Sequence, residues 1–284
     1  MSMNSVNTNM GATIALQSLN MTNSALQATQ KRISTGFRVA DANDDGAAFA
    51  VAQRVRSDVN ALGSANQQLG NVQGLLSTTS TALQNVSTTM SDARAVLVKL
   101  ADSTTQGTQR AQYIQQYQSL VQNMKTYFQD ATYSGKTLIG DIGGATGYGN
   151  IAVVRNELAA TYGVATFSGS AFMASITFTS TQLNGAATVA ALIGTATSAT
   201  FINQLTSLGT SMNTYGAAAK YVSNQVSYNS DKIDALNNGL GALIDADLAK
   251  ESAKLQSLQI RQQLGTQALS IANQAPQSLL SLFK

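Results

Sequence analysis

An apolar residue recurs at every seventh position through a long early part of the chain. The row comprises Val55, Leu62, Leu69, Leu76, Leu83, Met90 and Leu97. Small or apolar residues follow most of these three positions later, which gives the a/d pattern of a coiled coil. A helix of about 50 residues is about 75 Å long at ~1.5 Å per residue, longer than a compact domain needs. The spacing therefore predicts a left-handed supercoil with a partner helix.

The second half of the chain supplies that partner. Its row comprises Phe201, Leu208, Tyr215, Val222, Asn229, Leu236 and Leu243. Asn229 is the only polar member. A buried Asn at one such position often fixes the register of a coiled coil at some cost in stability.

A return helix and a β insert are expected between the two rows. Apolar residues over 113–127 predict a helix that turns back near 102–107 and packs antiparallel against the first. Glycine is frequent over 135–185, and residues 151–155 and 172–178 read as strands, the latter by strict alternation. We expect β-hairpins lying on the coiled coil.

Both ends of the chain repeat the heptad pattern more weakly. The recurring residues include Leu19, Leu26 and Ile33 at one end and Leu255, Leu264 and Ile271 at the other. Each buried Leu contributes roughly 1.5–3 kcal/mol, whereas ordering each residue costs roughly 1–2 kcal/mol. Because small and polar residues separate these few apolar ones, the ends should be disordered alone and fold against partner chains. The predicted fold is mainly α: a long antiparallel coiled-coil rod formed by the two chain ends, with a small β-hairpin insert.

Composition excludes several classes of site. The chain has 284 residues and contains no Cys, His or Trp, so thiolate and imidazole metal sites and Ser-His-Asp or Cys-His catalysis are impossible. Asp245 and Asp247 lie two positions apart at an expected helix start and point in different directions. We expect no enzyme and no cofactor.

The charge pattern indicates which partners the chain has. Charged residues make up only 11% of the chain, against an average near ~25%, and none occurs from Leu158 to Ala219. Such a surface is either covered by other chains or attached groups, or is made polar by Ser, Thr, Asn and Gln. The net charge is +3 and the basic residues are scattered, which argues against nucleic-acid binding. No cleavable signal and no apolar run of about 18 residues is present, so no membrane span is expected.

Local motifs resemble those of bacterial flagellin. They are RISTGFRV at residues 32–39 with DD at 44–45, IDADLAKES at 244–252, and ANQAPQSLLSLFK at 272–284. TYSGKTLI at 132–139 is similar to a further family segment. The resemblance covers roughly 1–140 and 200–284.

The resemblance implies a secreted subunit that self-assembles into the extracellular flagellar filament, in a short form lacking large outer domains. A flagellar hook–filament junction protein is the alternative, since its ends are similar. The implied partners are many copies of the chain itself, an export chaperone on the carboxyl-terminal segment, and hook-junction and cap proteins. Export would proceed through the flagellar type III apparatus.

The family layout assigns roles along the chain. The inner-core residues implied for self-assembly are Leu19, Leu26, Ile33, Leu255, Ile260, Leu264, Ile271, Leu280 and Leu282. The segments implied are an amino-terminal inner-core helix at 1–42, a long helix and return helix at 43–135, a variable β-hairpin insert at 136–200, a second coiled-coil helix at 201–243, and a carboxyl-terminal inner-core helix at 244–284.

The stretch DANDDG at residues 41–46 looks like half of a calcium loop, but its twelfth position is Ala52, which supplies no bidentate carboxylate. We expect a joint between two filament layers instead, where Gly36 allows a bend and Asp44 or Asp45 accepts free N–H groups at the start of the long helix. Arg32 and Arg38 of the first motif complete this interlayer joint.

One family feature is altered. Many flagellins carry R-x-R-E-L on the surface sensed by the innate flagellin receptor. The heptads align this motif with Asp92, Arg94, Ala95 and Val96 of the present chain, so that only Arg94 is retained. We expect weak or absent receptor activation, unless these are neutral surface changes.

Overall fold

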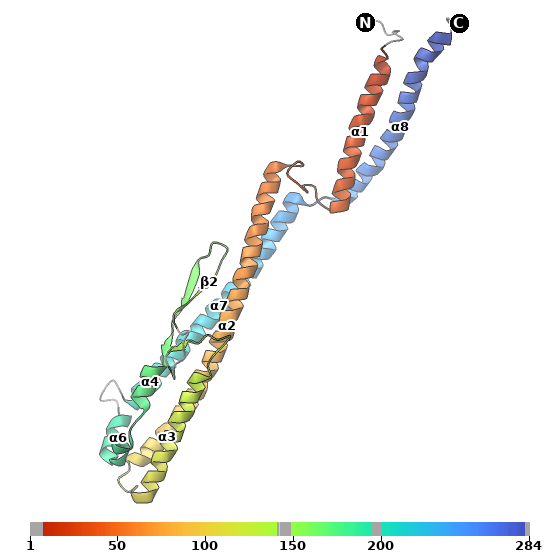
Figure 1. Cartoon of the computed structure of the whole chain (residues 1–284). Helices are drawn as coiled ribbons and strands as arrows, with labels where there is room; N and C mark the ends of the chain where they lie inside the picture. The colour runs from red at the N-terminus through yellow and green to blue at the C-terminus, as the bar shows by residue number, and fades with distance from the viewer. Residues whose placement is uncertain (1–7, 141, 143–148, 195–199, 282–284) are drawn as a thin grey trace. The chain divides into compact units, whose positions relative to one another are not determined.

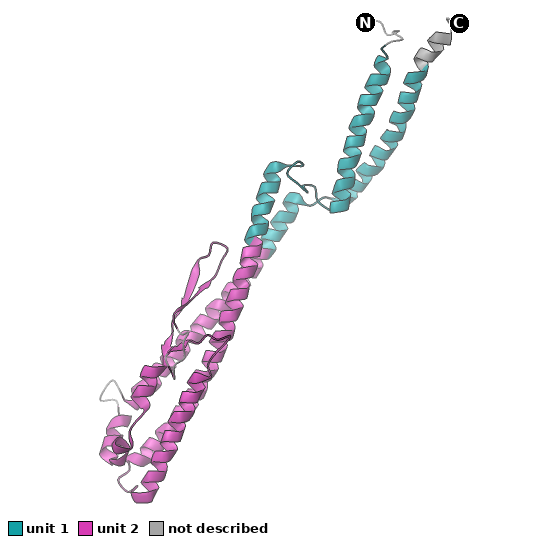
Figure 2. Cartoon of the chain, viewed as in Figure 1, with its two compact units in different colours: residues 1–58, 234–284 teal, residues 59–233 magenta. Residues whose placement is uncertain are grey.

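The structure is a computed structural model that describes residues 8–140, 142, 149–194 and 200–281, with side chains as far as residue 274 (Figure 1). The chain divides into two compact units (Figure 2). Unit 1 combines residues 1–58 and 234–284, and unit 2 comprises residues 59–233. Unit 1 therefore combines the two ends of the sequence, and unit 2 is the continuous segment between them.

Unit 1 is built from helices. Its complete helices are α1 (Met10–Thr35) and α8 (Leu248–Ser281), and it also holds the start of α2 (Gly46–Ala101) and the end of α7 (Phe201–Ile244). Asn9 caps α1 by accepting the N–H of Ala12, and Gly36 ends it at φ 73°, a conformation that glycine adopts without strain. A small core forms around Val39, Ala48, Ala52 and Ile244.

Unit 2 contains a larger core and the β insert. The rest of α2 and α7 packs with α3 (Gly107–Gln129), as predicted for the return helix. The shorter elements are β1 (Ile139–Gly140), β2 (Ile151–Val154), β3 (Thr161–Val164), β4 (Phe167–Ser168), α4 (Gly169–Ile176), α5 (Ser180–Asn184) and α6 (Ala186–Ile193). Strands β2 and β3 form an antiparallel hairpin, and β1 pairs in parallel with β4. The predicted fold class, mainly α with a small β insert, is confirmed, and so is the strand at 151–155.

The heptad row of α2 lies in the core of unit 2. Leu62, Leu69, Leu76, Leu83, Met90 and Leu97 are at most 1% exposed, while Val55 in unit 1 is half-buried. On α7, Leu208 and Val222 are fully buried, and Leu236 in unit 1 is half-buried. Large side chains at these positions bury one continuous stripe of each helix.

The strand predicted over 172–178 is wrong, because residues 169–176 form helix α4. Phe172 and Ile176 satisfy a period of two, but they are also four residues apart and so share a helix face. Phe172, Met173 and Ile176 are all buried. In a strand, Met173 would point to the opposite side from Phe172 and Ile176.

Asn229, the one polar member of the second heptad row, is completely buried and hydrogen-bonded. Its Nδ2 donates to Asn66 Oδ1 on α2 at 2.8 Å and to the carbonyl oxygen of Arg155, next to the hairpin strand β2, at 3.0 Å. Its Oδ1 accepts from Gln225 Nε2 at 2.9 Å. Asn229 therefore links both long helices and the hairpin at one register.

This network predicts a measurable cost for the Asn229→Ala substitution. The change removes the donor to Asn66 Oδ1 and one of the two donors to the Arg155 carbonyl oxygen, to which Gln225 Nε2 also donates at 3.3 Å. The free energy of unfolding should therefore fall by about 1–3 kcal/mol. Denaturant unfolding monitored by circular dichroism measures the change. Asn224→Ala, at an exposed position on the same helix, is the matched control and should shift stability by less than about 0.5 kcal/mol. Equal effects of the two substitutions would contradict the role given to Asn229.

Candidate self-assembly site

Helices α1 and α8 lie side by side and antiparallel (Figure 1). Partners that come later on α1 come earlier on α8, which fixes the antiparallel register. The polar contacts between them are Asn9 Nδ2 to the Ala272 carbonyl oxygen at 2.7 Å, Gln262 Nε2 to Asn23 Oδ1 at 2.8 Å, and Arg32 Nη1 to Glu251 Oε1 at 3.2 Å. The two ends of the chain thus form one terminal helix pair.

This terminal helix pair buries very little apolar surface. Of its described side chains only Thr29, Glu251 and Leu258 are buried. Large apolar side chains that are 47–68% exposed are Met10, Ile14, Leu16, Met21, Leu248, Ile260, Leu264 and Ile271. This number of exposed large apolar side chains on one helix pair is typical of an interaction site.

The predicted inner-core residues separate into two sets. Leu19, Leu26, Ile33 and Leu255 are half-buried, whereas Ile260, Leu264 and Ile271 are exposed. Leu280 and Leu282 lie outside the described side chains. The predicted set is therefore partly buried within the chain and partly exposed on its surface.

Two buried polar atoms lie in the terminal helix pair without a hydrogen-bond partner among the described residues. They are Thr29 Oγ1 and Glu251 Oε2. The other carboxylate oxygen of Glu251 accepts from Arg32, whose side chain is 30% exposed. Arg32, predicted for the interlayer joint, thus fastens α1 to α8 near the end of α1.

After Gly36 the two halves of the chain pair through their backbones. Phe37 and Asp245 form an antiparallel bridge, the Arg38 N–H donates to the Ile244 carbonyl oxygen at 2.7 Å, and the Ala246 N–H donates to the Gly36 carbonyl oxygen at 2.9 Å. The Arg38 guanidinium also donates to the Leu243 carbonyl oxygen. Each of these bonds has at least one main-chain partner, so side-chain patterns in the sequence did not reveal them.

The acidic stretch at 41–46 pairs with Lys31, a contact that was not predicted from the sequence. Lys31 Nζ lies 2.6 Å from Asp41 Oδ2 and 2.9 Å from Asp44 Oδ2. The hydrogen bond from Lys31 lowers the pKa of both carboxyl groups, and the bond to Asp41 raises the pKa of Lys31. Lys31 lies ten residues before Asp41 on the last turns of α1, so only the chain reversal brings them together.

The acidic residues of the joint also cap the backbone. Asp45 Oδ1 accepts the N–H groups of Ala47 at 3.1 Å and Ala48 at 3.0 Å, which satisfies free donors at the start of α2. Asp44 instead accepts the N–H groups of Ala40 and Asp41. Among the described residues no cluster of three or more acidic side chains is placed to hold a metal ion.

The four residues aligned with the receptor motif do not share one surface. Asp92, Arg94 and Ala95 are exposed on α2, but Val96 is 3% exposed and packs into the core of unit 2. The assignment of Val96 to the exposed surface is therefore wrong, because its position on the helix faces the same core as Leu97 and Leu100.

No helix in the described part of the chain combines the length and apolar character needed to cross a membrane.

Comparison with known proteins identifies both ends of the chain. Residues 6–143 match the family model for the bacterial flagellin N-terminal helical region, and residues 192–283 match that for the bacterial flagellin C-terminal helical region. A flagellin of Brucella melitensis biotype 1 is 35% identical over 299 aligned residues, covering 99% of this chain and 100% of the relative. Flagellin FljK of Caulobacter vibrioides is 34% identical, and the alignment covers both chains completely.

A solved structure from Vibrio parahaemolyticus, described as a flagellar hook-associated protein, has a TM-score of 0.56. It is 15% identical, and the match covers 71% of this chain and 100% of that one. At this identity the likeness shows the shared fold alone, and it does not favour a junction protein over a filament subunit. The two family models and the full-length relatives show that this chain belongs to the bacterial flagellin family and is a structural subunit of the flagellar filament.

Proposed function

We propose that this chain enters the filament through its terminal helix pair, which buries its apolar residues against other copies of the chain. The observation that carries the proposal is the 47–68% exposure of large apolar side chains along both α1 and α8. Burial of one such side chain stabilises an assembly by roughly 1.5–3 kcal/mol, so a row of them supplies a strong driving force. A repeated contact that does not close on itself produces a helical fibre.

Within this proposal the segments have different places. Residues 1–42 and 244–284 form the inner core, and the coiled-coil segments 43–135 and 201–243 form the next layer. The insert at 136–200, with its β-hairpin and the short helices α4, α5 and α6, accompanies that layer. The exposed Ile260, Leu264 and Ile271, with Leu280 and Leu282 further on, supply contacts to neighbouring copies. Leu19, Leu26, Ile33 and Leu255 hold the pair itself together.

The interlayer joint connects the inner core to the coiled coil. Arg32 fastens α1 to α8, Gly36 reverses the chain, and Arg38 bonds to the end of α7. Asp44 and Asp45 fix the loop and the start of α2. These contacts tie the loop after α1 to the end of α7 and to the start of α2.

Further partners are inferred from the exposed ends. The carboxyl-terminal helix is a surface for an export chaperone before assembly, since its apolar residues require cover until they reach the filament. Hook-junction and cap proteins would meet the same ends of the growing filament, and the subunit would be secreted through the flagellar export apparatus. We infer no catalytic activity and no cofactor. The end helices are expected to be ordered only in contact with partner chains.

The assembly surface is tested by the paired substitutions Ile260→Asp and Leu264→Asp. Both side chains are 58% exposed in the single chain, so the monomer should keep its unfolding midpoint while polymerisation is lost. Sedimentation and electron microscopy measure polymer, and circular dichroism measures the fold. Gln256→Asp with Gln263→Asp, at exposed polar positions on the same helix, is the matched control.

Normal filaments from the Asp variants, or from chains lacking residues 1–40 or 245–284, would contradict the proposal. Unmodified chains should form long filaments of one component. Short caps or stable monomers would indicate the junction-protein alternative instead.

The joint predicts a pH dependence. The pKa of Asp41 and that of Asp44 are lowered from 3.8, so their contribution to stability is present above that value and is lost as the pH falls through the lowered pKa values. Lys31→Met should return the pKa of Asp44 toward 3.8, which carboxyl-carbon NMR measures. Lys254→Met, at an exposed position on α8, should leave it unchanged. An unaltered Asp44 titration in Lys31→Met would contradict the ion pair between Lys31 and Asp44.

The altered receptor motif predicts weak activation of the innate flagellin receptor. Compared with the R-x-R-E-L motif, Asp92 replaces the first arginine and reverses its charge, and Ala95 replaces the glutamate and removes its charge. Arg94 is retained. A cell reporter should therefore respond at a concentration at least about tenfold higher than for a flagellin carrying the full motif, which corresponds to about 1.4 kcal/mol. The double substitution Asp92→Arg with Ala95→Glu should increase the response. Potency equal to that of the full motif would contradict this prediction.

A further inference from the structure

The tip of the β2–β3 hairpin presents an isolated leucine to solvent. Leu158 lies in the turn between the two strands and is 80% exposed, the highest value among the large apolar side chains of the described residues. A single exposed leucine is common on protein surfaces and implies little by itself. Its surroundings in unit 2 make this one informative.

The hairpin tip is held firmly in place. The Arg155 N–H donates to the Ala160 carbonyl oxygen at 2.8 Å, and the Ala160 N–H donates to Asn156 Oδ1 at 2.9 Å. Glu157 accepts from Lys232 on α7 at 2.6 Å, which ties the tip to the long helix. The backbone that carries Leu158 is therefore held by bonds within the chain, which lowers the entropy cost of ordering the tip on binding.

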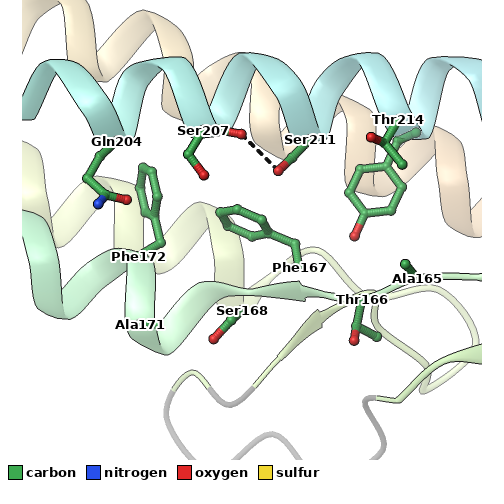
Figure 3. A pocket seen from close by; sticks show the side chains of 11 residues that line it. Ala165, Thr166, Phe167, Ser168, Ala171, Phe172, Gln204, Ser207, Ser211 and Thr214 are labelled. Carbon is green, nitrogen blue, oxygen red and sulfur yellow. Dashed lines mark hydrogen bonds between the residues drawn. The ribbon is translucent and has the colours of Figure 1, made fainter. Parts of the chain in front are cut away.

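An uncharged groove lies near the base of the same hairpin (Figure 3). It runs between α7 and the segment that carries β4 and the start of α4, and its volume is about 430 Å³. The rings of Phe167 and Phe172 line it from one side, while Ser207 and Ser211 face it from α7 (Figure 3). Aromatic rings and hydroxyl groups line the groove, and none of its lining residues is charged. Such a groove suits an apolar side chain.

The tip and the groove cannot meet within one molecule. The four extended residues of β3, Thr161–Val164, separate the turn that carries Leu158 from Ala165 at the edge of the groove, a span of about 13 Å at ~3.3 Å per residue. They are therefore two different surfaces of one rigidly connected unit. A projection and a recess on different parts of the same molecule generate open, repeating contacts between copies.

We propose that the Leu158 tip of one subunit inserts into the Phe167–Phe172 groove of a neighbouring subunit in the filament. This inference rests on the proposed function, because it requires a polymer. The groove has no charged lining residue and the Leu158 side chain is apolar, which favours the tip of a second copy of the chain as the occupant. No charged residue occurs from Leu158 to Ala219, so insertion of the leucine would bury no charge of the groove. Glu157, the nearest charge, is already neutralised by Lys232.

The chain lacks cysteine, so engineered cysteines can report the contact directly. Subunits carrying Leu158→Cys are mixed with subunits carrying Ser211→Cys, polymerised and oxidised. We expect disulfide-linked dimers in the filament fraction and none in the unpolymerised fraction, because a disulfide requires Cα atoms within about 7 Å. Gln116→Cys, at an exposed position on α3, replaces Ser211→Cys in the matched control and should give no dimer.

A second measurement concerns the strength of the contact. Leu158→Ser should raise the critical concentration for polymerisation on the order of tenfold, since the apolar burial is lost. Ser211→Tyr, which fills the groove, should act in the same direction. Val98→Ser, at another exposed apolar position of unit 2, is the matched control and should have little effect. Circular dichroism of each variant monomer verifies the fold.

The outcomes separate this inference from the function on which it rests. Filaments that form normally but give no dimer, together with an unchanged critical concentration for Leu158→Ser, would overturn the tip-and-groove contact alone. Unmodified chains that never polymerise would overturn both. Binding of a small neutral ligand in the groove of assembled filaments would also exclude insertion of the tip.

Discussion

Burial of the α2 heptad row is the interaction on which unit 2 depends. From Leu62 to Leu97 its members are almost completely removed from water, and the same core takes in Tyr117 of α3 and Phe201 of α7. Burial at this scale stabilises helices that are far longer than their own propensity would maintain. The hairpin and the short helices attach to this core, and through it they acquire fixed positions.

Unit 1 contrasts with unit 2 in how it uses the same heptad spacing. Its terminal helices have few large apolar residues, and much of that apolar surface remains exposed. The pair is aligned mainly by polar contacts such as Arg32 with Glu251, which are weak when partly exposed to solvent. One chain thus combines a unit that completes its own core with a unit that leaves large apolar side chains exposed, which we propose other copies of the chain cover in the filament.

Polar groups decide the geometry where apolar burial is non-directional. Asn229 fixes the register of the long helices and the position of the hairpin, because its buried amide requires specific partners. In the joint, Lys31 and the backbone bonds around Arg38 and Ile244 hold the chain reversal next to the small core of Val39, Ala48, Ala52 and Ile244. Such contacts contribute little total stability, but they select one arrangement among several that bury similar area.

The sequence by itself determined the long helices, the turn before α3 and the family, and it predicted Asp44 or Asp45 as the cap of α2, because heptad spacing, capping residues and motifs are local and appear in the residue order. It also singled out Asn229 without revealing its partners Asn66 and Arg155, which lie far away in the chain. The tertiary structure decided that Phe172 belongs to a helix, that Val96 is buried, and that Lys31 reaches Asp41 and Asp44. It also placed the Leu158 tip and the groove on separate parts of one unit. The physical reason is that periodicity specifies which side of an element is apolar, whereas partners and exposure depend on which distant segments the folded chain brings to that side.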